Sequence, residues 1–200
     1  MKLLYTPTSP YARKVLILAI ESGIDSQIER VNMNPWPEDS SVPEYNPLGK
    51  VPALVRDSGP ILFDSPVICE YLDGLSSSPR FFPQGEDRWR ALRMQAIADG
   101  MLDASVLWRL EAMRPQDKQH APWSDRQLTV IRQGLAALEH EADALNEPIS
   151  IAHIAVGCAL GYLDFRLGDE DWRTPHPRLA SWFATWVERP SMKATEPPSG

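Results

Sequence analysis

The sequence contains little cysteine, with only Cys69 and Cys158 among its 200 residues. Both lie in apolar segments with a helical pattern, where a free thiol is usually buried. Two isolated cysteines supply no disulfide framework, so the composition fits a reducing compartment. We therefore expect two buried, unpaired thiols.

An excess of positive charge is also missing. The 27 acidic residues outnumber the 20 basic ones, which gives a net charge of −7. Sequence-independent binding to nucleic acid needs Lys and Arg to neutralise phosphates, so this composition argues against a nucleic-acid partner. It leaves room for a local basic pocket that holds a small anion.

Long apolar runs are absent as well. The longest apolar region, residues 149–163, is interrupted by His153 and is too short to span a bilayer. The first residues reach proline and polar side chains too early for a signal peptide. We expect a soluble, cytoplasmic protein without a membrane partner.

The first 75 residues alternate strand and helix signals. Strands are predicted at residues 2–5, 27–31, 51–55 and 61–63, and helices from Pro10 to about Gly23 and from Ser65 to Leu75. The last two strands are joined by a tight turn and form a hairpin. The loop at residues 32–49 is rich in Pro and Asn and holds one helical turn. The predicted order is therefore β-α-β-α-β-β-α.

The second half is helical throughout. Helical periodicity covers residues 89–113, 128–145, 151–163 and 179–187. The segment 151–163 is apolar on nearly all sides, which predicts a buried central helix. The polar tail, residues 191–200, is expected to lie over the surface.

These patterns divide the chain into two domains. An α/β domain, residues 1–78, is followed by a linker at residues 79–85, which the run Ser76–Pro79 introduces. The remaining residues, 86–200, form an all-α helical bundle domain.

Ser9 is the first residue that could carry chemistry. It follows the first strand and opens the first helix, where free N–H groups and the helix dipole favour an anion such as a thiolate. The alternative is that Ser9 only caps the helix. The two roles are compatible, because both use the same position.

The pair Val51–Pro52 is the second candidate. Proline at a buried sheet sits at a bulge, an edge or a strand start. A cis bond would turn the backbone groups of Val51 toward a groove, where a bound peptide could pair with them. Since about one X-Pro bond in twenty is cis, the sequence alone favours an ordinary trans bond.

The pair Asp64–Ser65 lies between a predicted strand and a helix. The serine hydroxyl and nearby amides would hold a carboxylate, and the aspartate would hold an ammonium group. Together they suit an α-amino acid head group. A simple helix cap is again the alternative.

The three motifs together resemble those of the cytosolic glutathione transferases. The segments SPYARK, NPLGKVPALV and FDSPVICEYL match that family in order and spacing, and the resemblance covers essentially the whole chain. The ending TEPPSG is similar to that of a bacterial subgroup, the YibF-type proteins. The resemblance implies an N-terminal thioredoxin-like domain, a C-terminal helical bundle and glutathione as co-substrate.

The resemblance also implies roles for the three motifs. Ser9 becomes the catalytic hydroxyl that stabilises the glutathione thiolate. Val51, before a cis Pro52, binds the cysteinyl backbone, and Asp64 with Ser65 binds the γ-glutamyl head.

Further roles follow from the same resemblance. Lys50 reaches the glycyl carboxylate, and Asp99 approaches the γ-glutamyl group from a partner subunit, because many members are homodimers. No metal is implied. The second substrate, a small hydrophobic electrophile, would lie near Tyr11, Trp36, Met101 and Trp108.

One motif departs from the family pattern. Where the family usually shows Ser/Thr-x-x-Asp at the start of the buried helix, this chain has Ser150-Ile-Ala-His153. A histidine can accept a hydrogen bond from the Ser150 amide only when it is neutral. We expect His153 to be structural rather than catalytic, and the mismatch puts the stability of this helix start in question.

The expected activity is conjugation of the glutathione thiolate to an electrophile. A serine at position 9 excludes a mixed disulfide between that residue and glutathione. A glutathione-dependent peroxidase or reductase, in which the bound glutathione itself reacts, is an alternative. A non-catalytic protein that binds glutathione or another ligand is a third, since fold does not fix function.

Overall fold

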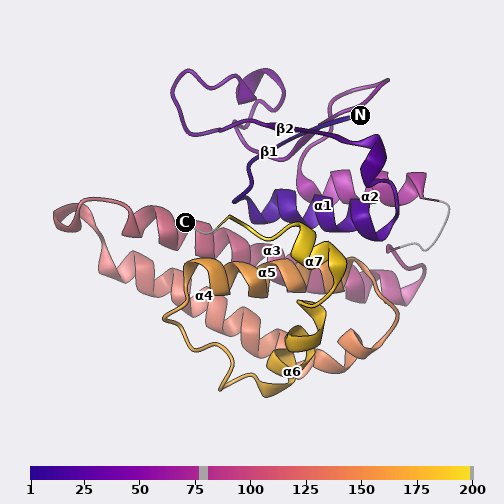
Figure 1. Ribbon diagram of the computed structural model, residues 1–200. Helices are drawn as coiled ribbons and strands as arrows, with labels where there is room; N and C mark the ends of the chain where they lie inside the picture. The colour runs from indigo at the N-terminus through magenta and orange to yellow at the C-terminus, as the bar shows by residue number, and fades with distance from the viewer. Residues whose placement is uncertain (77–80, 199–200) are drawn as a thin grey trace. The chain divides into compact units, whose positions relative to one another are not determined.

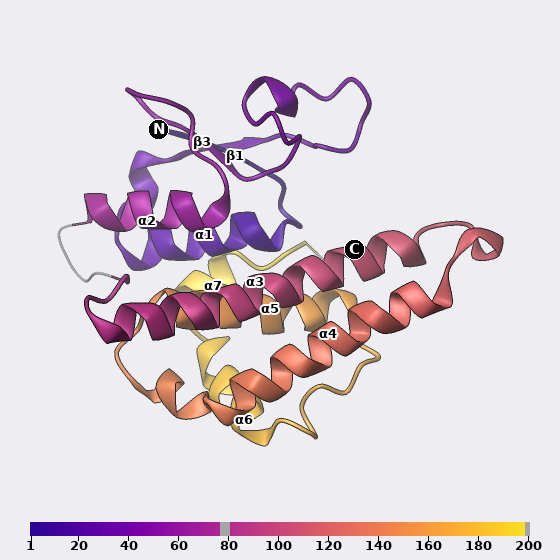
Figure 2. The same cartoon turned by 180° about the vertical axis from the view of Figure 1, so that it is seen from behind.

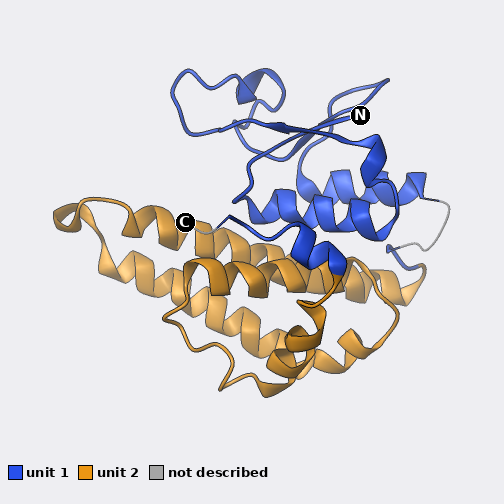
Figure 3. Cartoon of the chain, in the orientation of Figure 1, with its two compact units in different colours: residues 1–83, 190–200 blue, residues 84–189 orange. Residues whose placement is uncertain are grey.

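The computed structural model describes residues 1–76 and 81–198. The chain divides into two compact units (Figure 3): unit 1 comprises residues 1–83 and 190–200, and unit 2 comprises residues 84–189. The expected linker, residues 79–85, lies partly outside the described residues. Residues 190–200 group with unit 1, whereas the sequence pattern assigned them to the helical domain.

Unit 1 is built on a small mixed sheet of order β2-β1-β3 (Figure 1). The central strand β1 (Lys2–Tyr5) pairs in parallel with β2 (Glu29–Asn32) and antiparallel with β3 (Ala53–Val55). Leu3 and Leu4 of β1 are buried. The strand in the middle of the sheet therefore also contributes apolar side chains to the core.

Two helices of unit 1 lie side by side on one face of this sheet, as Figures 1 and 2 both show. They are α1 (Pro10–Glu21) and α2 (Ser65–Leu75), and each begins as the sequence predicts, with a proline in its first turn. A positive φ of 72° at Gly23 turns the chain away after α1.

The one helical turn expected in the loop at residues 32–49 is present as the short 3₁₀ turn η2 (Val42–Glu44). The strand expected at residues 61–63 is wrong in length. The fourth strand is a single bridge, in which Leu54 and Leu62 exchange backbone hydrogen bonds of 2.8 and 3.0 Å. Only Phe63 separates Leu62 from Asp64, the N-cap of α2, which leaves no length for a longer ladder.

The C-terminal segment is partly buried, so the expectation that it lies over the surface is wrong. It forms α7 (Pro190–Ala194), which packs against α1. The buried Arg13 donates from Nη2 to the carbonyl oxygen of Met192 at 3.0 Å and from Nε to Thr195 Oγ1 at 3.3 Å. A buried guanidinium needs such acceptors. These bonds hold the C-terminal segment against α1, although its composition is polar.

Unit 2 is helical, as expected. Its helices are α3 (Glu86–Ala112), α4 (Ala121–His140), α5 (Ile151–Arg166) and α6 (Pro177–Trp186), with 3₁₀ turns η3 (Gln116–Lys118) and η4 (Ala142–Asn146). The helix α3 packs against both α4 and α5. Every residue from 151 to 160 is buried, which confirms the prediction of a buried central helix.

The remaining short 3₁₀ turn, η1 (Asp25–Gln27), leads into β2. Both cysteines are buried, as expected. Among the described residues, no helix combines the length and the apolar character that crossing a membrane requires.

Close packing between α5 and α6 depends on a missing side chain. A Cβ added to Gly157 would lie 2.1 Å from Nε1 of the buried Trp186. Trp186 in turn stacks on Trp182, with ring centroids 5.1 Å apart. Glycine at position 157 thus lets an indole ring pack directly on the central helix.

The capping box at the start of α5 is complete, although His153 replaces the acidic residue usual in the family. The Ser150 amide donates to His153 Nδ1 at 3.1 Å, and the serine side chain accepts from the backbone of the third helical residue, which completes a capping box. His153 is 3% exposed and lies 5.8 Å from the ring of Trp186. Burial lowers the pKa of His153, although hydrogen bonds and the charge of Glu147 oppose the shift. The neutral ring that this cap requires is therefore favoured.

This cap makes stability depend on pH. The folded pKa of His153 lies below its unfolded value of about 6.5, so above that pH the group contributes no pH dependence. As the pH falls below about 6.5, the unfolded chain binds a proton that the folded chain resists, and stability falls by at most about 1.4 kcal/mol per pH unit. Between pH 7.5 and 5.5, we expect the free energy of unfolding in urea to fall by about 1 kcal/mol less in His153→Gln than in the parent.

The exposed His140 offers a matched control. The variant His140→Gln should keep the pH dependence of the parent. An unchanged pH dependence in His153→Gln would contradict the role assigned to the neutral ring.

Candidate functional site

Strand directions bring the three sequence motifs to one edge of the sheet. Because β1 and β3 are antiparallel, with Leu4 opposite Ala53, the end of β1 lies beside the start of β3. The bridge of Leu62 to β3 is also antiparallel, so the chain leaves Leu62 at this same edge. Ser9 follows β1, Val51 and Pro52 precede β3, and Asp64 and Ser65 follow Leu62.

Ser9 is the N-cap of α1. Its backbone is extended (φ −78°, ψ 118°), and its Oγ accepts a hydrogen bond from the Ala12 amide at 3.2 Å. Ser9 is half-buried. Since Oγ acts as an acceptor toward the helix, the hydroxyl proton is available to a second group. The capping role is thus present, and it is compatible with a second role as donor.

The Val51–Pro52 peptide bond is cis, so the trans bond that the sequence alone favoured is wrong. Pro52 is buried, whereas Val51 is half-buried. The ladder of β3 begins only at Ala53, so the backbone of Val51 lies outside the sheet pairing. The preceding Lys50 is exposed.

Asn46 shapes the approach to this turn, and the sequence analysis did not single it out. It is 1% exposed, donates from Nδ2 to the carbonyl oxygen of Lys50 at 2.9 Å and accepts from the Leu48 amide at 3.0 Å. Its own carbonyl accepts from the amide of Gly49 at 2.8 Å. One signal was present: asparagine before proline commonly starts a turn that its own side chain closes.

Asp64 and Ser65 open α2. Asp64 is the N-cap residue; its side chain makes no capping bond and is exposed, and its carbonyl accepts from the Ile68 amide at 3.0 Å. Ser65 is 1% exposed, and the peptide bond between Phe63 and Asp64 is cis. The carboxylate of Asp64 is therefore accessible to a ligand.

The edge as a whole suits a small zwitterionic peptide. Two helix N-termini, those of α1 and α2, offer amide groups and partial positive charge to anionic groups. The carboxylate of Asp64 offers the opposite charge. Backbone at Val51, outside the ladder, offers a hydrogen-bonding donor and acceptor.

The other predicted site residues lie partly in unit 1 and partly in unit 2. In unit 1, Tyr11 is half-buried in the first turn of α1, and Trp36 is 68% exposed in the loop after β2. In unit 2, Asp99 and Trp108 are half-buried on α3. Met101 is 1% exposed on the same helix.

Met101 has a defined packing role within unit 2. Its side chain occupies the space beside Gly134 of α4, where an added Cβ would lie 2.5 Å from its Cγ. Met101 therefore fills the contact between α3 and α4. Within residues 1–76 and 81–198, no group of three or more His, Cys, Asp and Glu side chains could hold a metal ion.

Two family models match the chain. Residues 8–75 match the glutathione S-transferase N-terminal domain, and residues 121–185 match the glutathione S-transferase C-terminal domain. The chain belongs to the glutathione S-transferase family. Its fold is that of the family, a thioredoxin-like domain with a small mixed sheet followed by a helical domain, which confirms the predicted fold class.

Individual relatives agree with this assignment along the full length. The chain is 36% identical to the uncharacterised glutathione transferase-like protein YibF of Escherichia coli K12, over 99% of each chain. A family member from Pseudomonas fluorescens Pf-5, crystallised with bound glutathione, is 45% identical, with a TM-score of 0.93 over 98% of each chain. A second structure of that kind from the same organism, with bound S-(propanoic acid)-glutathione, has a TM-score of 0.90 over 99% of this chain and 100% of the other.

The hydrogen bonds of Asn46 predict a measurable cost for its removal. Asn46→Ala leaves the carbonyl of Lys50 without its donor and the Leu48 amide without its acceptor, so we expect the free energy of unfolding in urea to fall by about 2 kcal/mol. Asn34 is a matched control, because it is exposed and its side chain accepts one bond, from the Trp36 amide. Asn34→Ala should cost less than about 1 kcal/mol. Equal losses in the two variants would speak against Asn46 as the anchor of this loop.

Proposed function

We propose that this chain binds glutathione and conjugates its thiolate to a small hydrophobic electrophile. The observation that carries the proposal is the meeting of three chain segments, at Ser9, Val51–Pro52 and Asp64–Ser65, at one edge of the sheet of unit 1. A tripeptide with an amino-acid head, a central backbone and a thiol needs these three kinds of contact.

Each part of glutathione has a proposed partner. The ammonium group of the γ-glutamyl head binds Asp64, and its carboxylate binds Ser65. The cysteinyl backbone pairs with the backbone of Val51, beside Pro52. The glycyl carboxylate lies within reach of the exposed Lys50.

The proposed catalytic group is the hydroxyl of Ser9. A free thiol has a pKa of about 8.5, so most of it is protonated at neutral pH. The hydroxyl proton of Ser9, together with the N-terminus of α1, stabilises the thiolate, and each unit of depressed pKa corresponds to about 1.4 kcal/mol. The thiol proton leaves to solvent, and the sulfur then forms a bond to the electrophilic carbon. In an aromatic halide the carbon–halogen bond breaks, and the halide leaves to solvent with the bonding electron pair.

Relatives support this function. The Pseudomonas fluorescens protein was crystallised with glutathione and with S-(propanoic acid)-glutathione, which is a glutathione carrying a substituent on sulfur. A protein from Methylobacillus flagellatus KT was also crystallised with glutathione bound. A serine at position 9 and a fully buried Cys69 favour chemistry of the bound thiolate over chemistry of a protein cysteine.

The proposed electrophile site and assembly follow the family pattern. Tyr11, Trp36 and Trp108 are proposed to contact the electrophile. Met101, which is 1% exposed and packs between α3 and α4, has no free surface to offer it. Asp99 is proposed to act on the glutathione that a second copy of the chain binds, in a homodimer.

Removing the charge of Asp64 tests binding. Because this side chain is exposed and makes no capping bond, Asp64→Asn should leave the melting temperature unchanged. Losing a charge-assisted bond to the ammonium group should weaken glutathione binding about tenfold, measured by calorimetry. Asp57→Asn, which changes another exposed carboxylate of unit 1, should bind like the parent. Unchanged affinity in Asp64→Asn would remove Asp64 from the site.

Removing the hydroxyl of Ser9 tests catalysis. Ser9→Ala should bind glutathione like the parent but lose most conjugation of an aromatic halide, with kcat/KM falling about tenfold or more. The lost cap costs about 1 kcal/mol of stability, so Ser9→Thr, which keeps a capping hydroxyl, serves as the control. If Ser9→Ala conjugates as well as the parent, Ser9 is not the catalytic hydroxyl.

A further inference from the structure

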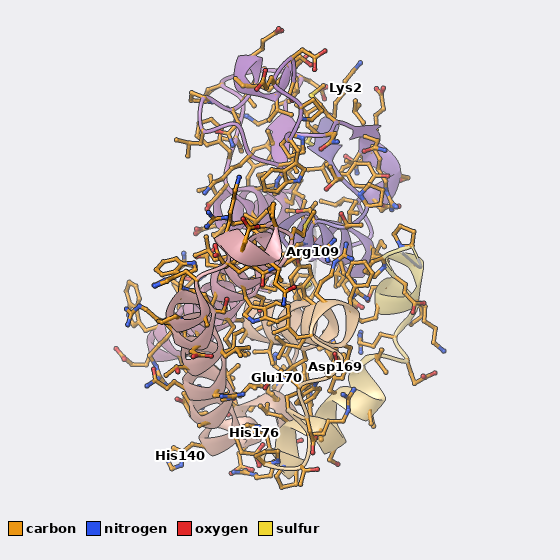
Figure 4. The ribbon with its side chains drawn as sticks, turned by 90° about the vertical axis from the view of Figure 1, so that its left-hand side faces the viewer. Lys2, Arg109, His140, Asp169, Glu170 and His176 are labelled. Carbon is orange, nitrogen blue, oxygen red and sulfur yellow. The ribbon has the colours of Figure 1, made fainter. Side chains whose placement is uncertain are left out.

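The C-terminal segment is bound to α1, the helix that Ser9 caps. Its short helix α7 packs against α1 within unit 1, and the yellow ribbon of α7 can be followed beside α1 in Figures 1 and 4. Arg13, in the first turn of α1, donates to the carbonyl oxygen of Met192 at 3.0 Å and to Thr195 Oγ1 at 3.3 Å. These two hydrogen bonds span 179 and 182 residues of the sequence.

The anchor that Arg13 makes depends on direction rather than on charge. Arg13 is 7% exposed, and among the described residues its partners are neutral oxygen atoms. Thr195 Oγ1 is itself oriented, because it donates to the carbonyl oxygen of Ser191 at 2.8 Å. A guanidinium group presents its donors in a fixed planar fork. Two acceptors, one at Nη2 and one at Nε, therefore fix the position of the side chain.

The backbone of Arg13 closes the helical turn that positions Ser9. The Arg13 amide donates to the carbonyl oxygen of Ser9 at 3.0 Å, and the Ala12 amide donates to Ser9 Oγ at 3.2 Å. Helix ends fray more readily than helix middles. An anchored side chain on the residue that makes the first hydrogen bond of the helix opposes this fraying. Arg13 can therefore act on the hydroxyl of Ser9 without touching it.

A second hydrogen bond holds the same segment at the other end of α1. The hydroxyl of the buried Ser191 donates to the carboxylate of Glu21, which is the last residue of α1. About two helical turns separate Glu21 from Arg13. The C-terminal segment thus has one anchor close to Ser9 and one remote from it, and each can be removed without the other.

We propose that Arg13 is a positioning residue for the thiolate chemistry at Ser9, with the C-terminal segment as its anchor. This inference rests on the proposed function. With the first turn of α1 held, the Ser9 hydroxyl and the free amides of the helix start keep one orientation toward the glutathione sulfur. Donors that are already ordered stabilise a negative charge better than donors that must first be ordered. Loosening Arg13 therefore raises the pKa of the bound thiol.

The pH dependence of conjugation tests this role. Arg13→Lys keeps the positive charge but lacks the guanidinium fork, and Thr195→Val removes the acceptor of Nε without altering α1. The measurement is kcat/KM for an aromatic halide at saturating glutathione. We expect each variant to raise the apparent pKa of the bound thiol by about half a unit, which lowers kcat/KM about threefold at pH values below that pKa. At pH values where the thiol is ionised in both proteins, kcat/KM should equal that of the parent.

The matched control is Ser191→Ala. It removes the bond to Glu21 from the same buried segment, at the end of α1 remote from Ser9. It should lower the melting temperature and keep the pH profile of the parent. Arg13→Met, which removes both the fork and the charge, should shift the profile at least as far as Arg13→Lys. A shift in Arg13→Met alone would assign the effect to charge and overturn the anchoring role.

The remaining outcomes separate this inference from the proposed function. If Arg13→Lys or Thr195→Val folds and keeps the profile of the parent, or loses the same fraction of kcat/KM at every pH, the positioning role is overturned while the proposed function stands. An equal shift in Ser191→Ala overturns it as well. If Arg13→Lys does not fold, Thr195→Val decides. If the parent itself conjugates no glutathione, the proposed function and this inference fall together.

Discussion

Pairing along β1 is the constraint on which the candidate site depends. This short strand hydrogen-bonds to β2 on one side and β3 on the other, and its leucines are buried, so neither its register nor its direction can change without exposing apolar side chains. Antiparallel pairing with β3, and of β3 with Leu62, returns the chain three times to one edge of the sheet. Residues far apart in sequence lie there because the strands that carry them begin or end at this edge.

Buried polar side chains fix loops and chain ends that lie outside the hydrogen bonding of the sheet and the long helices. Asn46 fixes the loop that leads into Val51, Arg13 fixes the C-terminal segment on α1, and His153 closes the start of α5. Each one supplies hydrogen bonds to backbone or hydroxyl groups that would otherwise be buried without partners. Such residues specify one arrangement of a loop or helix end, because any other arrangement leaves them unsatisfied.

Local charge in this protein is opposite to its total charge where ligands are proposed to bind. The chain carries a net charge of −7, yet the site edge in unit 1 presents two helix N-termini. The fixed partial charges of a helix N-terminus act at short range. An acidic surface is therefore compatible with sites that hold a thiolate and carboxylates.

The sequence by itself determined the helix starts at Pro10 and Ser65, the buried central helix, and the motifs at Ser9, Val51 and Asp64, because capping, periodicity and turn chemistry are local. Tertiary structure alone decided the single bridge at Leu62, the burial of the segment that Arg13 holds, and the role of Asn46. These depend on partners distant in the chain, and the free energy of burying a polar group is set by those partners rather than by its sequence neighbours. His153 of the capping box depends on both sequence and tertiary structure. The sequence places it three residues after Ser150, but only its burial beside Trp186 favours the neutral ring that can accept the Ser150 amide hydrogen bond.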